Sequence, residues 1–296
     1  MLAAASVVLS AALGVALWRR QVAQRVEAAD AARRPRDARG VVIGGEPFAL
    51  AGTNGAAVLL LHGFNDTPQS MRYLAARLHA AGYTVRVPRL PGHGCALPEL
   101  ARDARADDWR RAVAAEYAVL REGHDALFVC GQSMGGALAV SLATSQPDVR
   151  ALVLLAPFIG LEPQLGWKFR LARLSPAKYH RSPGAERSIH DPEARRAALG
   201  PGIVTAGALL ALRTVALAAE RALGALTLPT LYIQSVHDNR ITEDAAQRHF
   251  AAIGAREKAQ HWLSNSGHII SADYDRDEVA ARVQDWFARH RSGPAT

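Results

Sequence analysis

Short apolar runs alternate with amphipathic stretches along most of this chain of 296 residues. The apolar runs predict buried strands and lie at residues 57–61, 83–87, 127–130, 151–156, 230–234 and 258–263. Between them, apolar residues recur at helical spacing over residues 69–81, 109–121, 134–144, 243–253 and 276–290. Strands that alternate with helices predict an α/β domain over residues 41–296, with a mostly parallel sheet and helices on both faces.

The alternation lapses after the fourth of these strands, over residues 157–227. Helical pieces separated by prolines and glycines predict a small helical lid inserted over the carboxyl edge of the sheet. Residues 206–223 are unusually apolar, so one helix face would pack on the domain and a second could line an acyl pocket. Leu209, Leu212 and Val215 are therefore the candidate substrate-binding residues. The alternative is a lid helix whose apolar underside only packs.

The N-terminal segment predicts a separate element. Residues 2–18 carry no charged side chain, and Trp18 is followed at once by Arg19 and Arg20. This pattern predicts a single membrane-anchoring helix over residues 1–18, joined to the domain by an arginine-rich stalk over residues 19–40. Because the basic residues follow the apolar stretch, the positive-inside rule places the catalytic domain in the cytoplasm. A cleaved signal peptide followed by export remains the alternative.

Charge and cysteine content narrow the possible partners. The net charge is +8, from 35 basic and 27 acidic residues, and about half of the excess falls in the predicted stalk. The remaining basic residues form no stripe with interleaved aromatic residues, which argues against nucleic-acid binding. The two cysteines, Cys95 and Cys130, have neither metal-ligand spacing nor the pattern of a disulfide framework. The sequence therefore predicts no metal and leaves the oligomeric state open.

Residues 131–135 read Gly-Gln-Ser-Met-Gly and match the pattern G-x-S-x-G. The match is specific because an apolar strand precedes it and a helix follows it, as in the sharp turn that presents a nucleophilic serine. The flanking glycines are required because larger side chains would clash in so tight a turn. A serine hydroxyl is a weak nucleophile at neutral pH, so Ser133 needs a histidine base and a carboxylate that orients the base.

Chain order and loop position select the partners of Ser133. In this arrangement the acid follows the serine and the histidine follows the acid. Asp238 lies just after the strand at 230–234, and His268 lies just after the strand at 258–263. The carboxyl ends of parallel strands meet at one sheet edge, so we expect all three side chains at the same rim.

The oxyanion of an acyl-transfer intermediate needs two backbone donors. The N–H of Met134, directly after the nucleophile, is the first candidate. Phe64, in the loop after the first long strand, is the second, because Gly63 lets the backbone turn inward. His62 precedes the acid in the chain and is therefore interpreted as a residue that orders this loop.

Several motifs, in order over about residues 50–290, resemble the bacterial carboxylesterase and monoacylglycerol lipase group of the α/β-hydrolase superfamily. They are Leu59–Phe64, Pro88–Gly94, Asp108-Trp109, Gly131–Gly136, Leu152–Pro157, His237-Asp238 and Ser266–His268. The resemblance implies an α/β-hydrolase fold with an eight-stranded sheet, a helical lid and no cofactor. It also implies a catalytic triad of Ser133, Asp238 and His268, with Phe64 and Met134 forming the oxyanion hole.

These observations predict a serine hydrolase that cleaves carboxylic esters through an acyl-enzyme on Ser133. The expected substrate is a small-molecule or lipid ester, and membrane association is expected through residues 2–18. Two alternatives remain open at this point. The same triad could transfer the acyl group to an alcohol or thiol, or the chain could be a non-catalytic module of hydrolase fold that binds lipid or protein.

Overall fold

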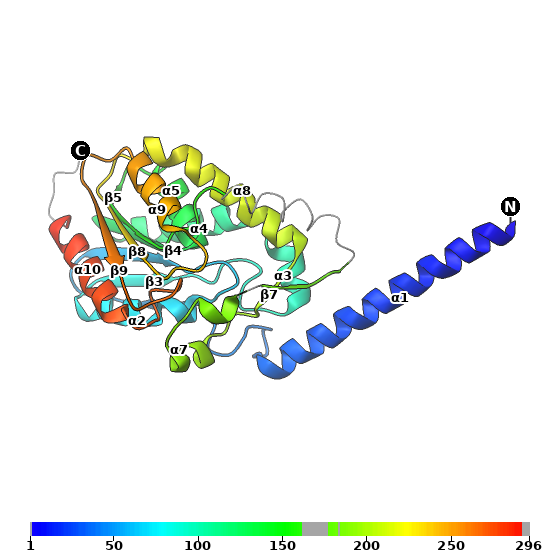
Figure 1. Ribbon diagram of the computed structural model, residues 1–296. Helices are drawn as coiled ribbons and strands as arrows, with labels where there is room; N and C mark the ends of the chain where they lie inside the picture. Colours follow the sequence, from blue (N-terminus) through cyan, green and yellow to red (C-terminus); the bar gives the residue numbers. More distant parts are fainter. Residues whose placement is uncertain (1, 162–176, 183, 292–296) are drawn as a thin grey trace.

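The computed structural model describes residues 2–161, 177–182 and 184–291, with side chains in the first helix described from Leu13 onward (Figure 1). A seven-stranded sheet forms the centre of the molecule, in the order β1-β3-β2-β4-β5-β8-β9. Its strands are β1 Phe48–Leu50, β2 Ala56–Leu61, β3 Thr84–Val87, β4 Ala126–Gln132, β5 Val149–Leu155, β8 Thr230–Ser235 and β9 Lys258–Leu263. All neighbours pair in parallel except β1, which runs antiparallel to β3.

The mostly parallel sheet is confirmed, but the described residues form seven of the eight strands expected. The six runs identified from apolar pattern all became strands, with bounds within three residues of those predicted. The short edge strand β1 is an addition that its pattern did not reveal. The eighth strand was implied by the family resemblance and has no counterpart in the described part of this sheet.

Two apolar cores lie on the opposite faces of the sheet, and β2 supplies side chains to both. Val58 and Leu60 point into one core, and Leu59 and Leu61 point into the other. This alternation explains the uninterrupted apolar run, because neither face of a central strand is left to water. Helices α2 and α10 cover the first face, while α4, α5 and α8 cover the second (Figure 1).

The helices follow the predicted spacing closely. They are α2 Arg72–Ala80, which continues the 3-10 turn η1 Pro68–Met71, then α3 Leu97–Asp103, α4 Ala106–Arg121, α5 Met134–Ala143, α9 Glu243–Ala252 and α10 Arg276–Arg289. Of these, α3 is the helix that the sequence pattern did not indicate. It follows the loop after β3 and packs Leu97 and Leu100 into the core beneath α8.

The region between β5 and β8 contains the predicted insertion, of which residues 162–176 lie outside the described residues. Its described part holds the two-stranded sheet β6 His180–Arg181 with β7 Ile203–Val204, the turn η2 Ala185–Arg187, the helices α7 Pro192–Ala197 and α8 Ala206–Ala222, and the turn η3 Leu223–Ala225. The hydroxyl of Thr205 accepts the N–H of Ala208 at 3.2 Å and so caps the start of α8.

The first helix, α1, runs unbroken from Leu2 to Arg33 and extends away from the domain (Figure 1). Its described side chains begin at Leu13, shortly before the first arginines. In the part of the chain that the structure describes, no helix combines the length and the apolar character that crossing a bilayer requires. The predicted membrane-spanning anchor over residues 1–18 is therefore wrong, and the cytoplasmic placement derived from it loses its basis.

The end of α1, within the predicted stalk, lies against the domain. Arg34 and Asp30, which are 2% and 5% exposed, form a bidentate ion pair with both N–O distances at 2.8 Å. The Arg34 guanidinium also donates to the carbonyl of Leu199 at 3.2 Å, and Arg33 donates to the carbonyl of Gly200 at 2.9 Å. The last turn of α1 is thereby fixed to the inserted region.

Candidate active site

Ser133 occupies the turn between β4 and α5, in a backbone conformation that side-chain-bearing residues rarely adopt (φ 55°, ψ −116°). Hydrogen bonds on both sides hold it there. Its N–H donates to the carbonyl of Leu155 at 2.9 Å, and its carbonyl accepts the N–H of Phe158 at 3.0 Å. The turn therefore directs the hydroxyl of Ser133 away from the sheet.

The glycines around Ser133 are required by close backbone contacts. A Cβ added to Gly131 would lie 2.2 Å from the carbonyl oxygen of Gly135. A Cβ added to Gly135 would lie 2.2 Å from the carbonyl oxygen of Leu61 in β2. Neither contact involves a side chain that could move aside, so the tight turn depends on the two missing side chains, as the sequence predicted.

The structure brings Ser133, His268 and Asp238 together at the carboxyl edge of the sheet. The hydroxyl of Ser133 lies 2.8 Å from Nε2 of His268, and Nδ1 of His268 lies 2.8 Å from Oδ2 of Asp238. All three side chains are buried. An imidazole between a hydroxyl and a carboxylate can accept the hydroxyl proton while the carboxylate fixes its tautomer.

The carboxylate of Asp238 is surrounded by donors. Its Oδ1 accepts the N–H groups of Arg240 at 2.7 Å and Ile241 at 3.0 Å, and its Oδ2 accepts the side-chain amide of Gln234 at 2.7 Å. Burial alone would raise the pKa of Asp238. The neighbouring His268 and the two backbone amides outweigh burial and hold this pKa below its ordinary value. Asp238 therefore remains an anion that can hold His268.

Two buried carboxylates fix the loop that carries His268, and no sequence pattern indicated this role. Asp275 accepts the N–H groups of Asn265 at 3.0 Å and Ser266 at 2.9 Å. Asp273, which is fully buried, accepts the N–H of Gly267 at 2.7 Å. Backbone amides of the inserted region, those of residues 190 and 191, donate to the same Asp273 carboxylate.

Gln132 also supports the histidine, from the nucleophile side. Its side-chain amide donates to the carbonyl of His268 at 3.0 Å and to the carbonyl of Leu155 at 3.1 Å. In the sequence it is only the variable position of G-x-S-x-G. Its location next to the nucleophile is the one signal that could have drawn attention to it.

The two predicted oxyanion donors flank Ser133. Met134 is the first residue of α5, and Phe64 lies in the loop after β2. That loop touches the nucleophile, since a Cβ added to Gly63 would lie 3.3 Å from the Cβ of Ser133. Neither the Phe64 nor the Met134 N–H has a hydrogen-bond acceptor among the described residues. Their role as donors to an oxyanion stays a prediction.

His62 orders this loop, as the sequence suggested. It is fully buried, its Nδ1 lies 2.8 Å from the carbonyl of Gly63, and its Nε2 accepts the N–H of Leu90 at 3.1 Å. Burial lowers the pKa of His62 to about 3, and the nearby His93 contributes to the decrease. His62 is therefore neutral at working pH and acts as a bridge between two loops.

The three candidate substrate-binding residues lie along α8. Val215 is fully buried and Leu212 nearly so, and both belong to the core that also contains Met134 at the start of α5. Leu209 is half-buried. Contact between these side chains and a substrate stays a prediction.

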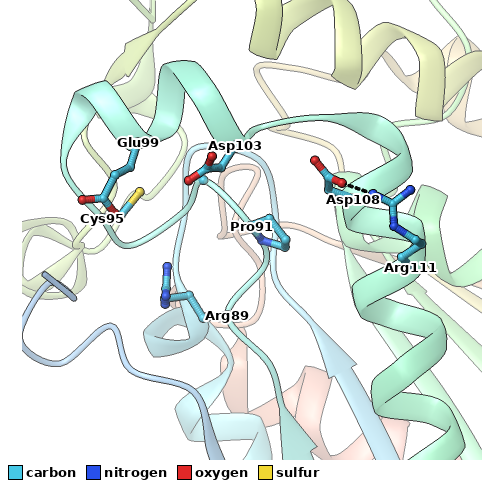
Figure 2. Close-up of a pocket in the computed structure, with 8 residues that line it drawn as sticks. Arg89, Pro91, Cys95, Glu99, Asp103, Asp108 and Arg111 are labelled. Carbon is cyan, nitrogen blue, oxygen red and sulfur yellow. Dashed lines mark hydrogen bonds and ion pairs between the residues drawn. The ribbon is translucent and has the colours of Figure 1, made fainter. Parts of the chain in front are cut away.

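A polar hollow of about 400 Å³ lies outside this site, beside α3 and the first turns of α4. Figure 2 shows its lining: Arg89, Pro91, Cys95, Glu99, Asp103, Asp108 and Arg111. Asp108 and Arg111 pair with each other across one end of it. Its lining includes none of the three residues that meet at the sheet edge. Among the residues that the structure describes, no group of three histidine, cysteine or carboxylate side chains is arranged to hold a metal ion.

Comparison with known proteins places this geometry in a family. A family model described as serine aminopeptidase S33 matches residues 52–275, which include the nucleophile turn and both partner loops. The chain belongs to this family of α/β-hydrolases. The fold class expected from the sequence is therefore confirmed, and so is the resemblance to lipolytic relatives.

Two relatives that match over most of the chain are ester-cleaving enzymes by name. A thermostable monoacylglycerol lipase of Bacillus sp. strain H-257 is 32% identical over 250 residues, or 84% of this chain and 97% of that protein. A carboxylesterase of Bacillus subtilis strain 168 is 26% identical over 248 residues, with 84% and 98% covered.

Solved structures agree in fold. One from work on LipS and LipT, two metagenome-derived lipolytic enzymes, has a TM-score of 0.76 and 31% identity, covering 84% of this chain and all of that chain. The monoacylglycerol lipase of Paleococcus ferrophilus has a TM-score of 0.71 at 16% identity, covering 82% and 98%. At that lower identity the likeness concerns the fold alone.

Proposed function

We propose that this protein is a serine hydrolase that cleaves carboxylic esters through an acyl-enzyme on Ser133. The observation that carries the proposal is the continuous contact from the Ser133 hydroxyl through His268 to the buried Asp238, with 2.8 Å at each step. The similarity to a monoacylglycerol lipase and a carboxylesterase supports ester substrates.

In this mechanism, His268 Nε2 takes the proton of the Ser133 hydroxyl as the oxygen attacks the ester carbonyl. The carbonyl oxygen becomes an oxyanion and accepts the N–H groups of Phe64 and Met134. The proton then passes from His268 to the leaving alcohol, and the acyl group stays on Ser133. Water repeats the sequence and releases the acid, while Asp238 stabilises the positive imidazolium each time it forms.

A second hollow, of about 230 Å³, is our candidate for the acyl-chain site. Its lining includes Phe158, whose N–H donates to the carbonyl of Ser133, together with residues of α9 and of the end of α8. Apolar side chains of Phe158, Ile159, Leu161, Leu223 and Ile241 form part of its wall, which also holds the ionisable residues Glu220, Arg240, Arg248 and His249. The apolar part of this lining would contact an acyl chain. Leu209, Leu212 and Val215 do not line this hollow, so their contact with the ester is a separate prediction.

Labelling with a fluorophosphonate probe tests the nucleophile. The intact protein should be labelled and the Ser133→Ala variant should not. Ser141→Ala is the matched control, because Ser141 lies on the same helix and its hydroxyl bonds only to the carbonyl of Ala137. A folded protein that resists labelling, or a Ser133→Ala variant that is still labelled, contradicts the proposal. Hydrolysis rates on p-nitrophenyl esters of increasing chain length would then measure the acyl site.

A further inference from the structure

Asp66 is a buried carboxylate beside the site that the triad mechanism does not use. It lies in the loop between β2 and η1 and is only 5% exposed. Gly63 separates it from the nucleophile: a Cβ built on Gly63 would lie 3.9 Å from Oδ2 of Asp66 and 3.3 Å from the Cβ of Ser133. The carboxylate and the nucleophile thus both lie within 4 Å of the space that a side chain on this glycine would occupy.

Every hydrogen bond of the Asp66 carboxylate shapes the loop that presents Phe64. Oδ1 accepts the N–H of Thr67 at 2.8 Å, and Oδ2 accepts the hydroxyl of Ser70 at 2.6 Å. Just before these anchors Asn65 adopts a left-handed backbone conformation, with φ at 60°. The carboxylate thereby holds the end of the loop that contains Phe64 against the start of η1.

His268 is the ionisable group that Asp66 faces. Burial is the largest influence on Asp66 and raises its pKa to about 6, while the charge of His268 acts in the opposite direction. The other histidines of the neighbouring loops, His62 and His93, are kept neutral, because burial lowers their pKa values to about 3 and about 4. His268 therefore interacts with two carboxylates, with Asp238 through a direct hydrogen bond and with Asp66 through its charge.

We propose that Asp66 is a positioning residue for ester cleavage, which holds the turn that presents the Phe64 N–H and whose negative charge favours the protonated form of His268 in the transition state. The role depends on the proposed function, since it acts through His268 and Phe64. Both effects would appear only once charge develops in the reaction, so they act on kcat more than on substrate binding.

The decisive variant is Asp66→Asn, which keeps the size of the side chain and an acceptor oxygen but removes the charge. We expect kcat on a short p-nitrophenyl ester to fall about three- to tenfold while KM stays the same. The pH at which kcat/KM is half-maximal should move about half a unit or more toward acid, because the imidazole loses a neighbour that favours its protonated form. A pH profile that superimposes on that of the parent protein overturns the proposal.

Ser70→Ala provides a second variant that leaves Asp66 in place. Loss of the 2.6 Å hydrogen bond removes one group that favours the ionised carboxylate, so Asp66 stays neutral to higher pH. We expect a smaller acid shift of the same profile than in Asp66→Asn. A shift toward alkali in Ser70→Ala counts against the proposal, and this variant carries the test if Asp66→Asn does not fold.

The fluorophosphonate probe separates this proposal from the proposed function. If the parent protein is labelled on Ser133 and hydrolyses esters, but Asp66→Asn changes neither kcat nor the pH profile, only the role of Asp66 is refuted. If the folded parent protein is not labelled at all, the serine mechanism itself is refuted, and the role of Asp66 falls with it.

Discussion

The side-chain amide of Gln132 donates a 3.0 Å hydrogen bond to the main-chain carbonyl of His268. The residue that precedes the nucleophile therefore holds the loop that carries the base, and both atoms are buried. The same amide bonds the carbonyl of Leu155 at 3.1 Å, so it joins β5 to the histidine loop.

We expect Gln132→Leu to lower kcat about tenfold and to destabilise the fold by about 1 to 3 kcal/mol, because the buried carbonyl of His268 loses this donor and that of Leu155 keeps only the Ser133 N–H. Steady-state kinetics and thermal unfolding measure the two effects. Gln284→Leu is the matched control, since Gln284 also donates to a main-chain carbonyl, that of Arg77 at 2.8 Å, but on the exposed surface. Equal losses in both variants would show that Gln132 has no special link to His268.

Asp273 connects the histidine loop to the inserted region, so its removal should affect the reaction and the insertion together. Its carboxylate accepts backbone amides from both sides, at Gly267 and at residues 190 and 191. We expect Asp273→Ala to cost about 3 kcal/mol or more, because these buried donors are left unpaired. Kinetics under conditions where the variant remains folded should show a lower kcat, and limited proteolysis should cut the region near residue 190 sooner.

Asp37→Ala is a suitable control for Asp273→Ala. Asp37 also accepts two backbone amides, those of Arg39 and Val41 at 2.9 Å, but it lies in the segment after α1 and far along the chain from the site. We expect this control to leave kcat unchanged. If Asp273→Ala lost stability but kept the kcat of the parent protein, the proposed link between Asp273 and the base would be refuted.

The sequence predicted the parts of this protein whose signal is local. A strand that is buried on both faces of the sheet has a continuous apolar run, and a helix that covers the sheet has apolar residues at helical spacing. The six strands and the longer helices between them, though not α3, could therefore be located. Ser133 could be located because the turn that carries it needs glycines at fixed positions. Loop position and chain order then sufficed for Asp238 and His268, which the structure brings together.

The supporting residues could not be predicted because their partners are distant in sequence. Gln132 bonds a residue 136 positions away, and Asp273 bonds amides 82 and 83 positions away. The contacts of Arg34 with the inserted region also join segments that are distant in sequence. Because no local pattern indicates such contacts, the sequence predicted a separate stalk over residues 19–40. A pattern within one stretch of chain carries no information about such contacts.

The close contact at Gly135 predicts that alanine substitution there will destabilise the protein far more than alanine substitution at Gly123. A Cβ at Gly135 would lie 2.2 Å from a main-chain oxygen of β2, whereas a Cβ at Gly123 would have nothing within 4 Å. We expect Gly135→Ala to cost about 3 kcal/mol or more and to abolish fluorophosphonate labelling, because the nucleophile turn must move. Gly123→Ala should change stability by less than about 0.5 kcal/mol. Equal unfolding midpoints for the two variants would contradict the tight turn.

As the pH rises, ionisation of Asp66 and ionisation of Asp275 should change the stability of the fold in opposite directions. The reason is that the fold raises the pKa of Asp66 and lowers that of Asp275. Burial raises the pKa of Asp66 from its ordinary 3.8 to about 6. The folded chain thus binds this proton more tightly than the unfolded chain does, and the resulting stabilisation is lost as the pH rises through about 6. At Asp275, burial also raises the pKa, but the hydrogen bonds from Asn265 and Ser266 outweigh it and lower the value. Its stabilisation is present at neutral pH and is lost toward acid.

Asp66→Asn should therefore make the protein more stable than the parent at pH 8, by up to about 3 kcal/mol, with the difference vanishing below about pH 4. Asp275→Asn should make it less stable at pH 8, with the loss shrinking toward acid. Chemical denaturation from pH 4 to pH 8 measures both differences. A residue that served the fold alone would lose stability on neutralisation, so a less stable Asp66→Asn at pH 8 would argue that Asp66 is structural. A more stable but slower variant is the result expected if this buried charge is kept for the reaction.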